Sequence, residues 1–141
     1  MIEIIFALHI LISFIMFGSV WFVQMVDYPL FRFVGKKSLG NYEKERIRRV
    51  LSVAFILMII ETITATILIF TPQIIPTTFA IINLALMIPI WIITCKVEVP
   101  VHRALTKGYK QKEENKLLRG NKYRVFFYTL RIIILFLVLT Q

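Results

Sequence analysis

Ionisable side chains interrupt or directly follow the long apolar runs of this sequence. Glu61 and Arg131 each lie within such a run, and Glu98 and His102 follow a third run at a spacing of four residues. Because a charge among hydrocarbon chains is costly, such a residue is by default a hypothesis for a functional site. A carboxylate and an imidazole can exchange a proton and a guanidinium can stabilise negative charge, so these residue types favour acid–base chemistry.

The helical repeat gathers the polar residues onto single faces. At about 100° per residue, those of the first run fall within about 60° of one another and those of the fourth within about 80°. The first set is His9, Ser13, Gln24 and Asp27, together with Val20, and the second set is Asn121, Arg124, Tyr128 and Arg131. Along the third helix, one side is predicted to carry Cys95, Glu98 and His102. We expect these faces to meet inside a helical bundle.

The depth of each residue along its helix predicts one polar pocket. Glu61 lies near the middle of its run and Arg131 at a similar depth in the fourth helix, so the two are expected to form an ion pair near mid-membrane. The remaining polar residues gather at one end of the bundle, namely Gln24, Asp27, Tyr28, Glu98, His102, Asn121 and Arg124. We expect a pocket that opens at this end and has the Glu61–Arg131 pair as its floor.

Each residue of this pocket has a predicted role and a structural alternative. The predicted catalytic residues are His102, Glu98 and Arg124, and the predicted ligand-binding residues are Gln24, Tyr28, Glu61, Asn121, Tyr128 and Arg131. In the structural alternatives, the Glu61–Arg131 pair only fixes the helix register and Glu98 with His102 is a solvated surface pair. For His9, an interhelical hydrogen bond is favoured over chemistry.

Residue counts and spacing exclude several kinds of site. Cys95 is the only cysteine, so an internal disulfide and a two-cysteine redox relay are excluded. His9 and His102 are too far apart along the bundle to hold one haem, and the Glu98–His102 pair has no second copy for a di-iron site. The sequence has no phosphate-binding, dinucleotide or nucleophile-elbow motif. We expect neither a metal nor a cofactor.

Four apolar runs must position these residues. They cover residues 4–26, 50–70, 79–95 and 125–140. With 58% hydrophobic residues and a mean hydropathy of +0.78 over 141 residues, the chain is too apolar to bury its hydrophobic side chains in a core that faces water. The first run lacks the basic start and cleavage pattern of a signal peptide, so we expect it to be retained. The prediction is an all-α, up-down bundle of four transmembrane helices, with residues 1–141 as a single domain.

The basic residues predict the orientation of this bundle. The connection at 27–49 contains seven Lys and Arg residues and the one at 96–124 contains nine, together sixteen of the seventeen. Basic loops stay in the cytoplasm, so both long connections are placed there, with both termini outside a cell (inner) membrane. The net charge of +9 then reflects topology and attraction to lipid headgroups, and no nucleic acid partner is expected.

Local signals predict the helix ends. Pro29 is expected to stop the first helix at Asp27 or Tyr28, and Asn41 is expected to cap the second helix. Gly108 is predicted to stop the third helix, and the fourth is predicted to start near Glu113 and Glu114. Residues 71–78 contain two prolines and are predicted to form a tight hairpin.

Three motifs resemble a group of small bacterial four-helix membrane proteins with no assigned activity. They are WFVQMVDYPLF at residues 21–31, Val99-Pro100-Val101-His102 followed by Leu105 and Gly108, and Asn121 with Arg124 and Arg131. The group often has a histidine before the Tyr-Pro and a tryptophan after the asparagine, where this chain has Asp27 and Lys122. The resemblance spans nearly the whole chain, implies the four-helix fold and points to Gln24, Tyr28, His102, Asn121, Arg124 and Arg131. In architecture alone, the chain is also similar to four-helix membrane families that include cofactor-free anthrone oxygenases.

Three functions fit these observations. In the first, the pocket binds a small amphipathic or aromatic molecule from the cytoplasmic leaflet, in one version as a cofactor-free enzyme. In the second, Glu61 exchanges a proton for a substrate during transport. In the third, the chain is a structural or assembly subunit. The lipid bilayer is the expected surrounding, and a homo-oligomer is compatible with all three.

Overall fold

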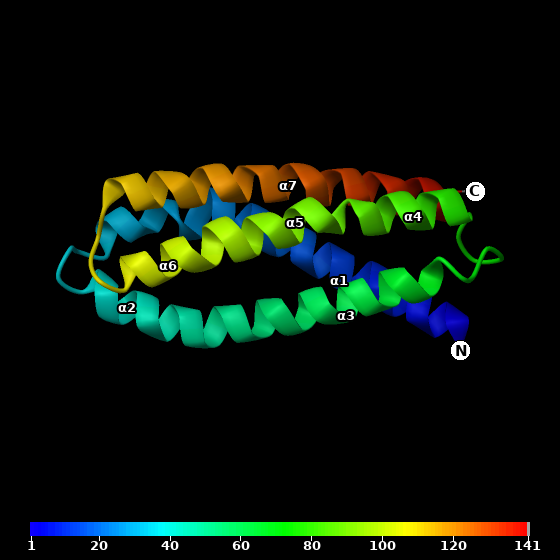
Figure 1. Ribbon diagram of the computed structural model, residues 1–141, viewed down its shortest axis with the longest axis horizontal. Helices are drawn as coiled ribbons and strands as arrows, with labels where there is room; N and C mark the ends of the chain where they lie inside the picture. The colour runs from blue at the N-terminus through cyan, green and yellow to red at the C-terminus, as the bar shows by residue number, and fades with distance from the viewer. Residues whose placement is uncertain (141) are drawn as a thin grey trace.

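The computed structural model describes residues 1–140, which form four long helices packed side by side, and no strand occurs among them (Figure 1). The all-α prediction is therefore confirmed. Three of the helices are long and apolar enough to cross a membrane, those at Ile2–Phe33, Leu39–Leu68 and Thr77–Leu105. The N- and C-terminal ends lie at the same end of the bundle, opposite the turn between α6 and α7 (Figure 1).

The first helix consists of α1 (Ile2–Phe22), a π-helical turn (Val23–Asp27) and a 3₁₀ turn (Pro29–Phe33). The α- and π-helical part ends at Asp27, where a stop is predicted, but the chain continues in a helical path: Tyr28 keeps helical backbone angles, and its N–H bonds to the carbonyl of Val23 at 3.1 Å. The wider π turn and the tighter 3₁₀ turn accommodate the proline ring, which lacks an N–H. Tyr28 is thereby held on the inner face.

The second helix consists of α2 (Leu39–Arg46), a π turn (Ile47–Leu51) and α3 (Ser52–Leu68). The prediction that Asn41 caps it is wrong. Gly35, with a φ of 85°, turns the chain, and its carbonyl accepts hydrogen bonds from the N–H groups of Ser38 and Leu39. The helix begins earlier than predicted, so Glu43 lies inside it rather than in its first turn.

The third helix is divided into α4 (Thr77–Ala85), α5 (Met87–Ile93), a π turn (Thr94–Glu98) and α6 (Val99–Leu105). Breaks of this kind are expected at Pro89 and Pro100, because a proline removes a hydrogen bond of the turn before it. The prediction that Cys95 shares a side with Glu98 and His102 is wrong, since Cys95 is exposed and Thr94 takes the inner position. The π turn has more residues per turn, which shifts the register.

The fourth helix, α7 (Gln111–Leu139), follows a turn in which Gly108 has a φ of 134°. The prediction of a stop at Gly108 and a restart near Glu113 is confirmed to within a few residues. The Tyr109 hydroxyl donates to Glu114 Oε2 at 2.6 Å, which raises the pKa of Tyr109 and secures this turn. Unlike the other three helices, α7 carries three basic residues in its last 18 positions, Lys122, Arg124 and Arg131.

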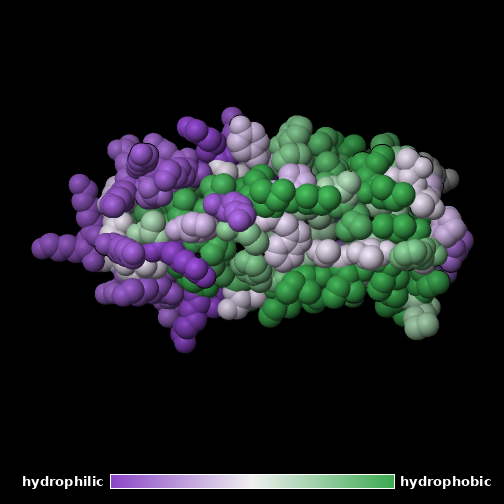
Figure 2. All heavy atoms as spheres, viewed as in Figure 1, coloured by the Kyte–Doolittle hydropathy of each residue, from purple (hydrophilic) through white to green (hydrophobic). Residues whose placement is uncertain are grey.

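Side chains of different polarity occupy different lengths of the bundle. Hydrophilic residues concentrate at the end that contains α2, α6 and the start of α7, and apolar residues cover most of the rest (Figure 2). The core has a central apolar cluster on all four helices, which includes Met16, Met58, Ile90 and Val125. A second apolar cluster at the hydrophilic end includes Phe31, Leu39, Leu105 and Leu117. Buried polar side chains lie on both sides of the central cluster.

Candidate functional site

A completely buried ion pair joins α3 to α7. Arg131 Nη1 donates to Glu61 Oε1 at 2.6 Å, and neither side chain is exposed. The same carboxylate oxygen accepts the Ser13 hydroxyl at 2.8 Å, and the Tyr128 hydroxyl donates to Glu61 Oε2 at 3.3 Å. The ion pair predicted from the sequence is therefore confirmed.

Further polar side chains complete this group, which we call the inner cluster. Arg131 donates through Nε and Nη2 to Asn83 Oδ1 at 3.3 and 3.0 Å. His9 Nδ1 lies 2.8 Å from the Thr64 hydroxyl, so the interhelical hydrogen bond favoured for His9 is confirmed. The inner cluster comprises His9, Ser13, Glu61, Thr64, Asn83, Tyr128 and Arg131. Its carboxylate and guanidinium are well supplied with partners, which is the condition under which a buried pair is tolerated.

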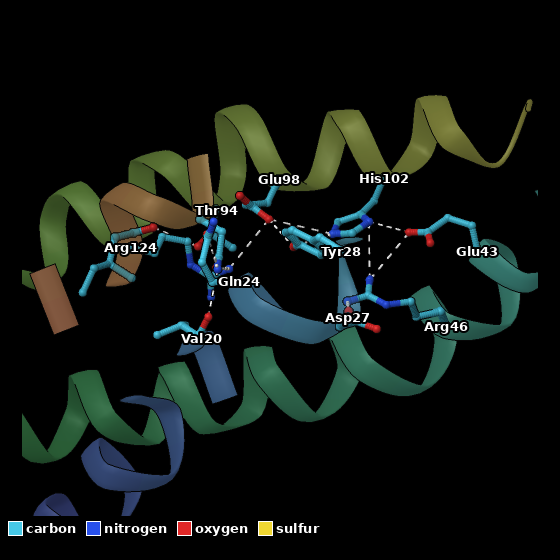
Figure 3. Close-up of polar contacts among 12 residues, drawn as sticks. Val20, Gln24, Asp27, Tyr28, Glu43, Arg46, Thr94, Glu98, His102 and Arg124 are labelled. Atoms are coloured by element: carbon cyan, nitrogen blue, oxygen red, sulfur yellow. Dashed lines mark hydrogen bonds and ion pairs between the residues drawn. The ribbon is translucent and has the colours of Figure 1, made fainter. Parts of the chain in front are cut away.

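A second polar group, the end cluster, lies toward the hydrophilic end (Figure 3). It comprises Asp27, Tyr28, Glu43, Arg46, Glu98, His102 and Arg124. The Tyr28 hydroxyl donates to Glu98 Oε2 and lies 3.0 Å from His102 Nε2, while His102 Nδ1 is hydrogen-bonded to Glu43 Oε1. The bonds form a continuous chain from Glu98 through Tyr28 and His102 to Glu43.

This series of hydrogen-bonded side chains has the donors and acceptors that a proton relay needs. With Glu43 ionised, His102 Nδ1 carries the proton of their contact, and Nε2 faces Tyr28 as an acceptor. Tyr28 has a single hydroxyl proton, so it can donate to Glu98 or to His102 but not to both at once. Movement of that proton would connect the carboxyl group of Glu98 with the imidazole.

Arg46 supports the same residues from α2. It forms an ion pair with Asp27, and its Nη1 lies 3.7 Å from Glu43 Oε1. Its guanidinium lies 5.3 Å from the ring centroids of both Tyr28 and Phe31, within cation–π range. Arg46 therefore fixes the tyrosine ring and the carboxylate that orients His102.

Arg124 is the less well paired arginine of the end cluster. Its Nη1 lies 3.8 Å from Glu98 Oε2 and donates to Asn121 Oδ1 at 3.4 Å, both long contacts. Asn121 is held in turn, because its Nδ2 donates to the Val20 carbonyl at 2.9 Å and to Gln24 Oε1 at 3.1 Å. Gln24 and Asn121 thus lie behind Arg124 and position it.

Most of the unpaired buried polar atoms belong to the end cluster. Among residues 1–140, five buried side-chain atoms have no hydrogen-bond partner, and only Asn83 Nδ2 lies elsewhere. The four in the end cluster are Glu43 Oε2, Arg46 Nε, Glu98 Oε1 and Arg124 Nε. Buried polar atoms in folded proteins are nearly always paired, so their concentration here distinguishes the end cluster from the inner cluster.

A cavity of about 350 Å³ adjoins the end cluster. Its walls are mainly apolar and come from α1 and α3, with Met16, Val20 and Met58 among them. Its polar lining comes from Ser19, Tyr28, Arg46, Arg49, Thr94, Glu98, His102 and Arg124. The cavity is therefore amphipathic and falls within the usual size of small-molecule sites.

The π turns surround this cavity. Val23 belongs to the first π turn, Val50 to the second, and Thr94 and Glu98 to the third, and all four residues line the cavity. Such turns bulge out of the regular helical path and recur at functional sites. Three of them at one level of the bundle explain why the helices separate there.

The structure brings together some of the residues predicted for the pocket and separates others. Tyr28, Glu98, His102 and Arg124 line the cavity, with Gln24 and Asn121 behind them. The prediction that the Glu61–Arg131 pair forms the floor of the pocket is wrong. Glu61 and Arg131 lie in the inner cluster with Tyr128, and none of the three lines the cavity. The central apolar cluster separates the two groups, since along each helix its side chains lie between the residues of the end cluster and those of the inner cluster.

Sequence reasoning missed Glu43 and Arg46. Both belong to a charged segment that looks like a solvated loop, yet Glu43 is fully buried and Arg46 nearly so. A signal was present, because Leu39, Glu43 and Arg46 follow the i, i+4, i+7 pattern of one helix face.

The described part of the chain contains no group of three or more His, Cys, Asp or Glu side chains able to hold a metal ion.

Comparison of the chain with protein-family models, curated proteins and solved structures gave no match.

Proposed function

We propose that this chain is a four-crossing integral membrane protein whose cavity binds a small amphipathic molecule. Support for α7 as the fourth crossing comes from Arg131, which is fully buried and neutralised by Glu61. The outward side chains of the same segment are apolar and include Phe126, Ile133 and Phe136. A buried, paired arginine does not meet the lipid, so its cost is far below that of an exposed charge.

The proposed orientation places the hydrophilic end in the cytoplasm and both termini outside a cell (inner) membrane. Sixteen of the seventeen Lys and Arg residues belong to the two connections at this end. Such a distribution is the usual result of the positive-inside rule. The end cluster then lies near the cytoplasmic boundary of the bilayer, where a molecule with a polar head and an apolar body would reside.

The observation that carries the binding proposal is the combination of an apolar cavity with the unpaired polar atoms at its end. An apolar body fits against Met16, Val20 and Met58, and a polar head can supply partners for Arg124 and Glu98. Ligand sites commonly have this form, with mostly apolar walls and a few convergent polar groups that fix orientation. Contacts with other described residues leave Glu98 Oε1 and Arg124 Nε without a hydrogen-bond partner.

The same arrangement supports general acid–base chemistry on the bound molecule. His102, oriented by Glu43, and Glu98 are connected through Tyr28, so either can give or take a proton. Arg124 can stabilise the negative charge that proton removal leaves on an oxygen of the ligand. An enzyme that transfers protons is therefore the version of the proposal that uses Arg124 as well as the hydrogen-bonded residues Glu43, His102, Tyr28 and Glu98.

The test uses protein purified in mild detergent, from which small molecules are extracted and identified by mass spectrometry. We expect one class of amphipathic molecule to be retained by the parent protein. Ala54→Phe, which places a ring in the cavity wall, and Arg124→Gln should both lose it. The control is Ala7→Leu, a change of the exposed Ala7 on the same bundle but far from the cavity.

Size-exclusion and circular dichroism profiles must stay unchanged for the comparison to count as loss of binding. Equal retention in the parent, Ala54→Phe and Arg124→Gln would contradict the proposal. So would a parent protein that retains nothing above the level of bulk lipid.

The transport alternative gains no specific support. Its carboxylate, Glu61, is bonded to Ser13, Tyr128 and Arg131 and does not line the cavity. Proton exchange would have to break this buried pair, which is costly. We assign the inner cluster a structural role, which fixes the register of the four helices.

A further inference from the structure

The cavity continues into a groove on the outside of the bundle. This outer groove, of about 510 Å³, runs along α1 past Phe14, Gly18 and Phe22 and is bounded by Val50 on the second helix. It shares four lining residues with the cavity, namely Ser19, Val23, Arg46 and Val50. The cavity beside the end cluster and the outer groove therefore adjoin at these four residues, between the first and second helices.

The surface that borders the outer groove is apolar. Phe14, Phe22 and Val50 are 43%, 58% and 42% exposed, and Val53 at the rim of the cavity is 59% exposed. In the proposed orientation these side chains face lipid, so the cavity communicates sideways with the bilayer.

The opposite route, through the hydrophilic end of the bundle, is closed by packing. The apolar cluster there contains Phe31, Leu39, Leu105 and Leu117, each at most 1% exposed. Glu43 and His102, which lie next to this cluster, are also buried. The packing of these residues therefore blocks entry to the end cluster between the ends of the helices.

Gly18 keeps the groove open. A Cβ atom added at this position would have no heavy atom within 4 Å, so the space beside it is free. Glycine is otherwise unfavourable inside a helix. The small side chains of Gly18 and Ser19 leave room along α1 for something as thin as a hydrocarbon chain.

The charged lining of the cavity favours a negative head. Arg46, Arg49 and Arg124 line it together with one carboxylate, Glu98. Arg46 is paired with Asp27 and Arg49 with Glu45, so Arg124 is the lining arginine without a close counter-charge. Arg124 has only long contacts, and the Nε atoms of Arg46 and Arg124 are unpaired. A carboxylate or phosphate is the head group that guanidinium groups bind best.

From these observations we infer that the occupant is a single-chain anionic amphiphile taken directly from the bilayer. Its acidic head lies beside Arg124 and Arg46, and its hydrocarbon chain leaves past Ser19 and Val50 and lies in the outer groove beside Gly18. This inference rests on the proposed binding function and adds to it the class of ligand and the route that the ligand takes.

The test uses a fatty acid that carries a photoreactive diazirine near the end of its chain. The protein is reconstituted in nanodiscs of phosphatidylcholine, irradiated and digested, and the labelled residues are mapped by mass spectrometry. We expect labels to concentrate on residues 14–22 and 50–53. A fatty alcohol with the same chain and diazirine should label these segments about tenfold less, because it lacks the charge that Arg124 and Arg46 bind. A long-chain alkyl phosphate probe shows which acidic head is preferred.

Variants make the assignment specific. At Gly18 an added Cβ meets no heavy atom within 4 Å, so Gly18→Leu should occupy the outer groove and reduce labelling of residues 14–22 severalfold, whereas Ala7→Leu should leave it unchanged. Arg124→Gln should reduce labelling by the acid to the level of the alcohol, and Arg124→Lys should keep part of it. The parent level in Gly18→Leu, or equal labelling by acid and alcohol, would overturn the inference.

The two proposals fail in different ways. If a molecule co-purifies and is lost in Ala54→Phe while the diazirine labels the exposed faces of all four helices evenly, only the present inference is wrong. If nothing co-purifies and labelling is also even, the binding function itself is wrong.

Discussion

At the scale of single residues, the two polar clusters differ in how completely their atoms are paired. In the inner cluster Glu61 has three hydrogen-bond donors and Arg131 binds both Glu61 and Asn83. In the end cluster Arg124 and Glu98 each keep an unpaired atom. Only Asn83 Nδ2 is unpaired in the inner cluster, and nearly complete pairing suits a group that holds helices together, whereas the less complete pairing of the end cluster suits a group that receives a partner.

Loss of one member of the inner ion pair should be strongly destabilising. Glu61→Gln leaves the Arg131 charge buried without its counter-charge, and we expect a cost of about 3–5 kcal/mol, measured as a lower midpoint of unfolding in detergent. The double variant Glu61→Leu/Arg131→Met removes both charges and should recover most of the loss. A double variant that is less stable than Glu61→Gln would contradict the assigned structural role.

At the scale of elements, the π turns decide what the cavity is made of, and they are also what sequence periodicity misses. The regular helical repeat predicted the buried faces of α1 and α7 correctly, down to the Glu61–Arg131 pair. It misplaced Cys95, because the π turn at Thr94–Glu98 shifts the register beyond it. It also missed Glu43, whose position depends on the turn at Gly35.

The separation into two clusters was equally beyond the sequence. Depth along a helix places Glu61 and Arg124 only roughly, and the pattern contains no sign of how far the helices diverge. The cavity depends on how the side chains of α1 and α3 pack against each other. The spacing of residues along the sequence does not contain this information.

Two glycines provide an element-scale prediction with a built-in control. A Cβ at Gly120 would lie 2.8 Å from Glu98 Oε1 and 3.0 Å from Val97 Cγ1, so α7 must have glycine there for Glu98 to keep its place. We expect Gly120→Ala to destabilise the fold by about 1–3 kcal/mol and to weaken ligand retention. Gly18→Ala meets nothing within 4 Å and should leave stability unchanged or raise it by about 0.5–1 kcal/mol.

Thermal unfolding in detergent and mass spectrometry of the extracted ligand measure both effects. If Gly120→Ala and Gly18→Ala behave alike, then the close packing of Glu98 on α7 has no bearing on the site.

At the scale of the whole molecule, polarity is sorted along the bundle, and this sorting fixes the proposed orientation. The hydrophilic end contains α2, α6 and the start of α7, and the hairpin between α3 and α4 lies at the other end with the termini (Figure 1). The hairpin has no Lys or Arg at positions 71–78. Moving this hairpin across the membrane therefore has a low free-energy cost, whereas moving the basic connections has a high one.

Cysteine labelling tests the orientation directly. In a Cys95→Ser background, Gln73→Cys in the exposed hairpin should react with a membrane-impermeant maleimide on intact cells. Ser38→Cys, exposed at the hydrophilic end, should react only after the membrane is opened. The reverse pattern would place the end cluster outside the cell.

The central apolar cluster of Met16, Met58, Ile90 and Val125 stands between the two polar groups on every helix that contributes to both. Its one polar group is the Tyr128 hydroxyl, which is bonded to Glu61, so the layer disfavours a hydrogen-bonded file of water molecules. In the proposed orientation, this layer would confine the proposed proton exchange beside His102 to one leaflet, so the exchange would not discharge a proton gradient across the membrane.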